Sequence, residues 1–402
     1  MQKEIIRQLI KNKTSPAYIF DLDILRQNVR TIKEHLSSVA SICYAMKANP
    51  FLLDALKEEV DSFEVCSPGE FAICEAHSIA METIVLSGVN KEYKEISRVV
   101  TTYQGKGIYT VESPLHLAIL KDLAQQTGYK LQVLLRLSSK NQFGMDEDTI
   151  LSLLKDWPCN TLIFHGIQYY SGTQKKGLKK QTKELARLDD FIDEIESSTP
   201  HKVPLLEYGP GFYIPYFEGE DLVDDVSLLK EFRTMLSSMR FQGKIVLEMG
   251  RYIAALCGYY LTQVIDTKTS HKTNYCIVDG GINHLNYYGQ SMAMKLPTIA
   301  HFKGDLSAPL KVEATKADSW CICGSLCTVG DVIVRQYENQ NLSLGDYLLF
   351  EKLGAYSITE GIYLFLSRNL PKVYGYSEKE GLILYRDGLA TYPLNTNTST
   401  QV

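Results

Sequence analysis

A lysine at position 47 is the side chain of this 402-residue chain best placed for covalent chemistry. It follows a short run in which Ile42, Tyr44 and Met46 take alternate positions, the pattern of a buried strand that ends at a loop. A lysine there is partly removed from water, which favours the neutral, nucleophilic amine. Most lysines at strand ends simply extend to solvent, so the prediction depends on the residues that accompany Lys47.

Other residues suited to a reaction site recur where later strands are expected to end. In a (β/α) barrel the functional side chains lie on loops at the carboxyl ends of the strands, so residues at these positions should meet. Each has an ordinary explanation alone, but their joint placement favours one site. They are Glu64, Arg136, Tyr170, Gly209, Gly211, Glu248 and Arg251.

The Gly209-Pro210-Gly211 segment and Arg251 are suited to binding an anion. The two glycines carry no Cβ, so their backbone N–H groups can approach a bound group closely. Arg251 would add a forked, permanently charged partner of the kind that binds phosphate. The alternatives are a plain turn for the glycines and a surface ion pair between Arg251 and Glu248.

The elements that must position these residues alternate along the chain from residue 16 to about 255. Eight β-rich runs separated by amphipathic segments predict a closed (β/α)8 barrel rather than an open sheet. The strands are expected at 40–47, 63–67, 83–88, 107–112, 131–138, 161–170, 204–208 and 244–248. The helices are expected at 22–36, 69–79, 91–101, 114–127, 146–157, 176–197 and 221–240.

The residue pattern changes after Arg251. From there, short segments rich in aromatic and β-branched residues alternate with expected turns. This predicts a C-terminal antiparallel β domain. We expect residues 1–20 to join that domain, residues 21–255 to form the barrel, residues 256–390 the β domain, and residues 391–402 a disordered tail. The strands of the β domain are expected at 258–268, 273–279, 331–337, 346–352, 371–376 and 381–386.

The composition narrows the class of protein. A hydrophobic content of 45% and a charged content of 22% are those of an ordinary globular protein with a sizeable core. A net charge of −5 gives no reason to expect nucleic acid or an anionic membrane as partner. Nine scattered cysteines and no apolar leader predict reduced thiols and a cytoplasmic protein. The cluster of Cys321, Cys323 and Cys327 lacks the spacing of a zinc site, so no metal is expected.

An ordered set of seven motifs resembles the fold-type III pyridoxal-phosphate decarboxylases, the family of the diaminopimelate, ornithine and biosynthetic arginine enzymes. The resemblance covers roughly residues 16 to 375 and implies an alanine-racemase-like barrel with a second β domain. The motifs are YAMKAN at 44–49, FEVCS at 63–67, QFG at 142–144, GPGF at 209–212, EMGR at 248–251, GSLC at 324–327 and GAY at 354–356.

The resemblance implies that pyridoxal 5′-phosphate is bound covalently by Lys47. Glu248 would pair with the ring nitrogen and keep it protonated, which makes the ring an electron sink when CO2 leaves. Cys327 would reach in from a partner subunit and return a proton to the α-carbon, so the active sites would be shared in a homodimer. The residues implied to contact the cofactor otherwise are Glu64, Arg136, Gly209, Gly211, Arg251 and Tyr356.

Two departures from the family pattern concern the ring and the substrate. Tyr170 stands where the family places a stacking histidine; its ring can still stack, but no ionisable imidazole is present. Nearby His165 is expected in the core or on the barrel exterior. Thr328 follows the reactive cysteine where diaminopimelate and ornithine decarboxylases have an acidic residue, and Asp331 comes later. The second ammonium group of a diamino-acid substrate would then have no carboxylate at this position to pair with. Burying it without a partner would cost several kcal/mol of binding free energy.

These details look more like the decarboxylases of siderophore and antibiotic pathways. We therefore expect an α-decarboxylase acting on an L- or D-amino-acid centre within a conjugate or on a carrier protein. The Lys175–Lys180 run could attract an anionic part of such a substrate, or be a solvated helix start. The alternatives are a diaminopimelate or other diamino-acid decarboxylase, an amino-acid racemase, and a non-catalytic protein that holds the cofactor.

Overall fold

A computed structural model describes residues 3–304 and 317–397. The chain divides into two compact units. The barrel unit comprises residues 26–214 and 223–253, and the β unit comprises residues 1–25, 215–222 and 254–402.

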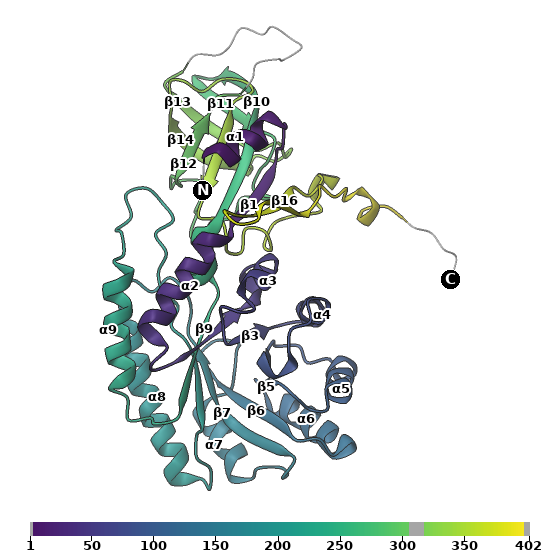
Figure 1. The fold of residues 1–402 in the computed structure, drawn as a ribbon, viewed down its shortest axis with the longest axis vertical. Helices are drawn as coiled ribbons and strands as arrows, with labels where there is room; N and C mark the ends of the chain where they lie inside the picture. Colours follow the sequence, from purple (N-terminus) through teal and green to yellow (C-terminus); the bar gives the residue numbers. More distant parts are fainter. Residues whose placement is uncertain (1–2, 305–316, 398–402) are drawn as a thin grey trace. The chain divides into compact units, whose positions relative to one another are not determined.

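The barrel unit is built on eight parallel strands that close on themselves in chain order. The predicted barrel is confirmed, with each strand within a few residues of its expected place. Figure 1 shows the helices around the outside of the strands. The strands are β2 (Ser41–Ala45), β3 (Ser62–Val65), β4 (Ile84–Leu86), β5 (Ile108–Val111), β6 (Leu131–Leu137), β7 (Leu162–Tyr170), β8 (Leu205–Gly209) and β9 (Lys244–Met249).

Local sequence signals explain where several helices begin. The Ser67 and Ser113 hydroxyls accept hydrogen bonds from backbone N–H groups in the first turns of their helices, and a proline follows each serine. Asp146 and Asp224 cap two further helices in the same way. The helices are α2 (Leu22–Leu36), α3 (Leu53–Leu56), α4 (Pro68–Ala76), α5 (Tyr93–Thr102), α6 (Pro114–Thr127), α7 (Glu147–Lys155), α8 (Lys179–Ser198), α9 (Asp225–Ser237) and α10 (Arg251–Ala254).

The barrel interior changes from apolar to polar along the strands. Cys43, Val85, Leu134 and Leu205 pack together as one apolar cluster contributed by alternate strands. Such layers of four side chains fill barrels of this kind. Because every second residue of a strand has the same orientation, Glu207 lies on the same face of β8 as Leu205, one step nearer the carboxyl end. The strand ends therefore carry the polar groups.

The β unit contains one sheet of nine strands in the order β14-β13-β11-β10-β1-β16-β17, with β15 paired to β10 and β12. Most pairs are antiparallel, as predicted, but β1 pairs with β16 and β11 with β13 in parallel. The strands are β1 (Ala17–Asp21), β10 (Gly258–Ser270), β11 (Thr273–Val278), β12 (Ile299–Phe302), β13 (Ser319–Cys323), β14 (Val332–Glu338), β15 (Tyr347–Glu351), β16 (Lys372–Ser377) and β17 (Gly381–Arg386).

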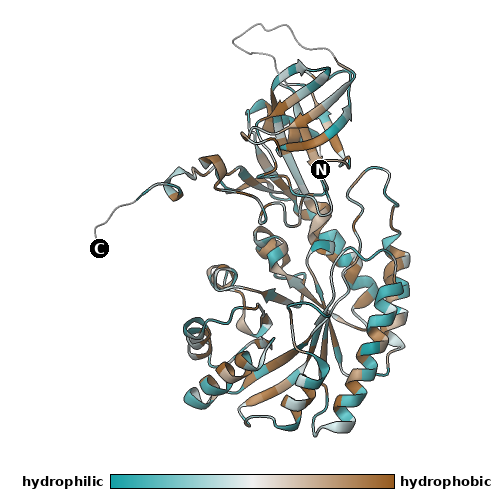
Figure 2. Cartoon of the chain, turned by 180° about the vertical axis from the view of Figure 1, so that it is seen from behind, coloured by the Kyte–Doolittle hydropathy of each residue, from teal (hydrophilic) through white to brown (hydrophobic). Residues whose placement is uncertain are grey.

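Three of these strands and one helix were not predicted. β1 is buried at all five positions and β12 is half-buried at all four, so neither shows the alternation of buried and exposed positions that marks a strand with one face in solvent, and β13 is a short run of five residues, three of them cysteine or serine. Helix α1 (Lys3–Lys11) packs on the sheet through Ile6 and Leu9, in one cluster with Tyr347 and Leu349. Figure 2 shows hydrophobic and hydrophilic stretches alternating along helices and strands, as burial of one face requires.

The expected disordered tail is only partly within the described residues. Residues 392–394 form a 3-10 turn, and the Asn395 side-chain amide donates to Leu364 O at 2.6 Å and to Ser367 Oγ at 2.9 Å. This part of the tail is therefore tied to the β unit, while residues 398–402 lie outside the described residues. Within residues 3–304 and 317–397, no helix has both the length and the apolar character needed to cross a membrane.

Candidate active site

Lys47 lies between two carboxylates at the carboxyl end of β2. Its Nζ is 2.6 Å from Glu64 Oε2 and 3.1 Å from Glu248 Oε1. The topology explains this, because β2 pairs with β3 on one side and with β9 on the other. The lysine side chain is 35% exposed, whereas those of Glu64 and Glu248 are 1% and 8% exposed. The amine is thus reachable from solvent while both carboxylates are buried.

The two carboxylates have opposite electrostatic characters. Burial alone would raise the pKa of Glu64, but the charge of Lys47 and its hydrogen bond more than offset this and hold the pKa below its usual range. Burial and the charge of Glu64 raise the pKa of Glu248. Glu64 is therefore the carboxylate that stays ionised, and Glu248 is the one that takes up a proton first.

Cys66 belongs to the same group, although the sequence reasoning gave it no role. Its thiol donates to Glu64 Oε1 at 3.3 Å, and its Sγ lies 3.8 Å from Lys47 Nζ. Burial and the neighbouring Glu64 charge raise the pKa of this thiol, so it remains protonated. The sequence held a signal for this contact. Residues 64 and 66 are two positions apart, and alternate residues of an extended segment point to the same side.

Glu207 and Gln168 form a second buried polar pair, which was also missed. Gln168 Nε2 donates to Glu207 Oε1 at 2.5 Å and to Ser87 Oγ at 3.3 Å. Both side chains belong to residues only 1% exposed. Burial and the charge of Glu248 raise the pKa of Glu207. The site therefore contains three buried acidic groups for one lysine, and two of the three are held toward their neutral forms.

The glycine loop after β8 lies against the end of β7. A Cβ at Gly209 would lie 2.5 Å from Tyr170 Cδ2, so the tyrosine ring occupies the space that any larger residue would need. Gly211 has a φ of +62°, and a Cβ there would lie 2.1 Å from Gly172 O. Arg251 is 9% exposed and its Nε donates to Thr173 Oγ1 at 3.2 Å. The structure thus brings Tyr170, both glycines and Arg251 to adjoining loops.

Within the described residues, Arg136 is held by Glu112 and Phe143. Its Nη1 pairs with Glu112 Oε1 at 3.1 Å, and its guanidinium lies 4.8 Å from the centre of the Phe143 ring. Glu112 also accepts the Gly144 N–H at 3.3 Å. Arg136 therefore anchors the QFG segment, and its contact with the cofactor remains a prediction.

The Lys175–Lys180 run does not act as a single basic surface. Lys175 is buried, and its Nζ pairs with Glu184 Oε2 at 2.7 Å, an oxygen that also accepts from Tyr208 at 2.6 Å. Neither alternative holds for Lys175, because its charge is neutralised inside the fold and is not in contact with solvent. The other three lysines of the run, Lys176, Lys179 and Lys180, are exposed.

The GSLC segment and its neighbours lie in the β unit. Cys327 and Thr328 are exposed, whereas Asp331 is buried. Asp331 Oδ1 accepts the Ile282 N–H at 2.8 Å, and Oδ2 accepts the Leu326 N–H at 2.7 Å. Both carboxylate oxygens thus accept backbone N–H groups, and one of these donors, Leu326, directly precedes Cys327 in the chain. The geometry favours a role for Asp331 in shaping the loop over direct contact with a substrate.

Tyr356 of the GAY segment has an unusual backbone conformation. Its φ of +68° is in the left-handed region, which is uncommon for residues other than glycine and is enriched at functional sites. Its carbonyl oxygen accepts the N–H groups of Thr359 and Glu360, which fixes the turn. The conformation is consistent with the predicted binding role, which stays a prediction.

The donor set suits a cofactor that carries a carbonyl group and a phosphate. Lys47 could hold the carbonyl carbon, and the loop at Gly209 with Arg251 could hold the phosphate. Within the part of the chain that is described, no group of three or more His, Cys, Asp or Glu side chains is arranged to hold a metal ion.

Comparison with known proteins identifies relatives over most of the chain. The family model described as pyridoxal-dependent decarboxylase, C-terminal sheet domain, matches residues 18–354. The L-glutamyl-[BtrI acyl-carrier protein] decarboxylase of Niallia circulans is 25% identical over 91% of this chain and 90% of its own. The 2-[(L-alanin-3-ylcarbamoyl)methyl]-2-hydroxybutanedioate decarboxylase of Staphylococcus aureus is 27% identical over 92% of this chain and 96% of its own. The crystal structure of diaminopimelate decarboxylase from Helicobacter pylori with L-lysine shares the fold, with a TM-score of 0.81 and 22% identity over 97% of this chain and 98% of that one.

Proposed function

The chain belongs to the pyridoxal-dependent decarboxylases, and from that premise we propose that its substrate is an amino-acid centre within a larger conjugate or on a carrier protein. The reaction class follows from the family: the enzyme releases CO2 with pyridoxal 5′-phosphate as cofactor. The substrate class is the proposal.

The residues of the barrel unit fit this cofactor. Lys47 would hold its aldehyde carbon, Glu248 its ring nitrogen, and the Gly209–Gly211 loop with Arg251 its phosphate. The fit is supported by the 3.1 Å pair between Lys47 and Glu248 and by the buried Arg251, whose Nε donates to Thr173 Oγ1 in the segment that Gly211 packs against. Tyr170 lies against Gly209, where its ring could stack on the cofactor.

When bound, the cofactor accepts the electron pair that the departing carboxylate leaves behind. The chain's own residues set the charge around it. Glu64 stays ionised and stabilises a positive charge on Lys47 Nζ, while the raised pKa of Glu248 makes it ready to exchange a proton. The exposed Cys327 would return a proton to the α-carbon from a second subunit.

One observation carries the substrate proposal: the GSLC loop offers no free carboxylate to a distal ammonium. Thr328 has a neutral side chain, and both oxygens of Asp331 accept backbone N–H groups. A diamino acid would leave its second ammonium without a partner, at a cost of several kcal/mol. The names of the two relatives from Niallia and Staphylococcus, a carrier-bound glutamyl group and an amide conjugate, support this direction.

The runner-up is a diaminopimelate decarboxylase, which the fold similarity also allows. The two are separated by measuring CO2 release from diaminopimelate, lysine, ornithine, glutamate, an amide conjugate of diaminopropionate with citrate, and a glutamyl group on pantetheine or on a carrier protein. Turnover of a conjugated or carrier-bound compound at a kcat/KM at least about tenfold above that of every free diamino acid is expected. Preference for diaminopimelate would reject the proposal.

A homodimer with shared active sites is part of the same proposal. A stretch that follows the GAY motif exposes several large apolar side chains, which is the usual mark of a surface covered by a partner. The exposed fractions are 55% for Ile362, 45% for Leu364, 40% for Phe365 and 49% for Leu366. Sedimentation analysis of the holoenzyme should give twice the mass of the chain.

A further inference from the structure

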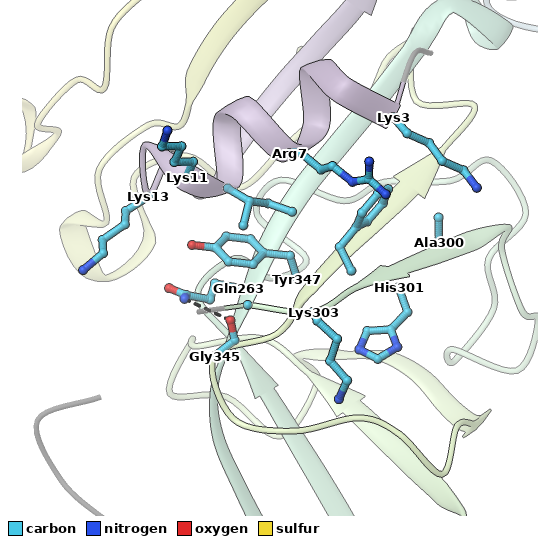
Figure 3. A pocket seen from close by; sticks show the side chains of 13 residues that line it. Lys3, Arg7, Lys11, Lys13, Gln263, Ala300, His301, Lys303, Gly345 and Tyr347 are labelled. Carbon is cyan, nitrogen blue, oxygen red and sulfur yellow. Dashed lines mark hydrogen bonds between the residues drawn. The ribbon is translucent and has the colours of Figure 1, made fainter. Parts of the chain in front are cut away.

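The β unit contains an open pocket of about 930 Å³ that the decarboxylase chemistry does not use. Figure 3 shows helix α1 and the turn after it along one side, with β12 and Tyr347 of β15 below. The cationic side chains that line it are Lys3, Arg7, Lys11, Lys13 and Lys303, and the neighbouring lining residue His301 contributes an imidazole ring.

Helix α1 supplies a regular row of positive charge to this pocket. Lys3, Arg7 and Lys11 are spaced by four residues, which places them on one face of the helix. Ile6 and Leu9 are buried in the core of the unit and fix the helix, so the row cannot rotate away. Lys3 and Lys11 make no ion pair with any described residue, and Arg7 meets only the exposed Glu4, at 3.5 Å.

On the opposite wall, one buried acid, Asp346, contacts both the His301 ring and the Lys303 amine. His301 Nε2 lies 2.7 Å and Lys303 Nζ 3.1 Å from Asp346 Oδ2. Asp346 also accepts the N–H groups of Ser343 and Gly304, so its position is fixed by the backbone. Lys303 Nζ also donates to the Asn341 carbonyl, and the side chain is 61% exposed, so a ligand can approach it from solvent. The single negative charge of Asp346 cannot neutralise both Lys303 and the lysine and arginine side chains on the α1 side of the pocket.

The charge of the pocket opposes that of the whole chain. Among residues 3–304 and 317–397, five lysine and arginine side chains and no acidic side chain line it, although the chain has a net charge of −5. The floor is different in character, because Ile10, Ala300, Phe302 and Tyr347 contribute apolar and aromatic surface. A volume of this size suits a small ligand, and a cationic rim over an aromatic floor suits one with several negative charges on a planar or apolar body.

We propose that this pocket is a second ligand site, which binds a small polyanion carrying phosphate or carboxylate groups. The row on α1 would pair with the negative groups, and the floor at Phe302 and Tyr347 would contact the rest of the molecule. The site is formed by the β unit alone and does not depend on which substrate is decarboxylated.

The test is calorimetric titration of ATP, inorganic pyrophosphate and citrate into the holoenzyme, whose cofactor already fills the phosphate loop of the barrel. The variant K3A/R7A/K11A removes three charges from the pocket, and alanine is well tolerated in a helix, so α1 should remain folded. The control K130A/K268A/K379A removes three exposed charges that do not line the pocket.

At least one probe should bind, with affinity lowered about tenfold or more in the pocket variant and less than about twofold in the control. Binding of ATP and pyrophosphate without citrate would assign a phosphate ligand, and binding of citrate alone a carboxylate ligand. No binding at millimolar concentration, or equal binding by the two variants, would overturn the proposal. So would binding of an acidic carrier protein that needs Lys3, Arg7 and Lys11 when all three small probes fail.

Discussion

Lys47 Nζ lies closer to Glu64 Oε2, at 2.6 Å, than to Glu248 Oε1, at 3.1 Å. The carboxylate nearest this amine is therefore not the one that would pair with the cofactor ring. Glu64 pairs with the ammonium group of Lys47, and its negative charge also raises the pKa of Glu248. A single buried acid thus influences both groups that would hold the cofactor.

Replacing Glu64 by glutamine should separate these two effects. Loss of the charged hydrogen bond to Lys47 is expected to lower kcat at least about tenfold. Because the Glu64 charge is one cause of the raised Glu248 pKa, the acidic limb of the pH–rate profile should also shift to lower pH. Steady-state CO2 release across pH measures both. An unchanged profile would show that Glu64 does not act on Glu248.

Cys66 should act as a positioning residue for Glu64. Its thiol donates to Glu64 Oε1, so Cys66→Ala removes one neutral hydrogen bond and is expected to lower kcat about two- to tenfold. Cys66→Ser keeps a donor and should recover most of the activity. The matched control is Cys74→Ala, because Cys74 is buried but does not contact Glu64. Equal effects of the alanine and serine variants would reduce the role of Cys66 to packing.

Much of the barrel and part of the site could be predicted from the sequence. Regular alternation of strands and helices fixed the fold class, and the strand ends located Lys47, Glu64 and Glu248, which the closed barrel brings together. Glu207 and Gln168 were missed because single polar residues inside a strand carry no signal until the register is known. The register places them opposite each other on β7 and β8.

The β unit was harder to predict for a physical reason. The partners of its short strands are far apart in the chain, as in the pairing of Ala17–Asp21 with residues 372–376. No local pattern encodes such a pairing. The role of Asp331 was obscured in the same way, because its partner Ile282 is 49 residues away.

The stability of the cofactor-free enzyme should depend on pH through Glu248. Its folded-state pKa is raised above the value near 4.3 of an unfolded glutamate, so the folded protein binds the proton more tightly. Between these two values stability falls as pH rises, and above the folded pKa the penalty is complete. Glu248→Gln lacks this penalty, so its urea resistance relative to the wild type should rise from about pH 4.3 to about pH 7 and stay constant above that.

The contribution of Glu64 has the opposite sign. Its folded-state pKa is lowered, so its stabilising effect is present above pH 4.3 and is lost as pH falls further. Glu64→Gln should lose urea resistance relative to the wild type at neutral pH, but by less than the full Glu64 contribution, because removing the Glu64 charge also lowers the pKa of Glu248 and with it the Glu248 penalty. A difference in urea midpoint between Glu248→Gln and wild type that does not change with pH would contradict the assignment.

Subunit mixing should reveal whether active sites are shared. Lys47→Ala and Cys327→Ala are each expected to be inactive when purified alone. If the cysteine of one subunit completes the site of the other, random mixing makes half of the dimers hybrid, and each hybrid has one intact site. About a quarter of wild-type activity should return. The absence of any recovery, with hybrids demonstrated by affinity tags, would place both residues in the same subunit's site.

Asp331 should matter for the conformation of the Cys327 loop and little for cofactor binding. Asp331→Asn keeps one acceptor oxygen and leaves either the Ile282 or the Leu326 N–H without its partner, a cost of about 1–3 kcal/mol. We expect kcat to fall about tenfold or more while the visible absorbance of the bound cofactor and its affinity stay unchanged, because the loop would no longer hold Cys327 in place. Asp387→Asn, an exposed position of the same unit paired with Lys372, is the control and should leave kcat unaltered. If Asp331 instead contacts the substrate directly, its replacement should raise KM for the true substrate more than it lowers kcat, and thermal stability should not change.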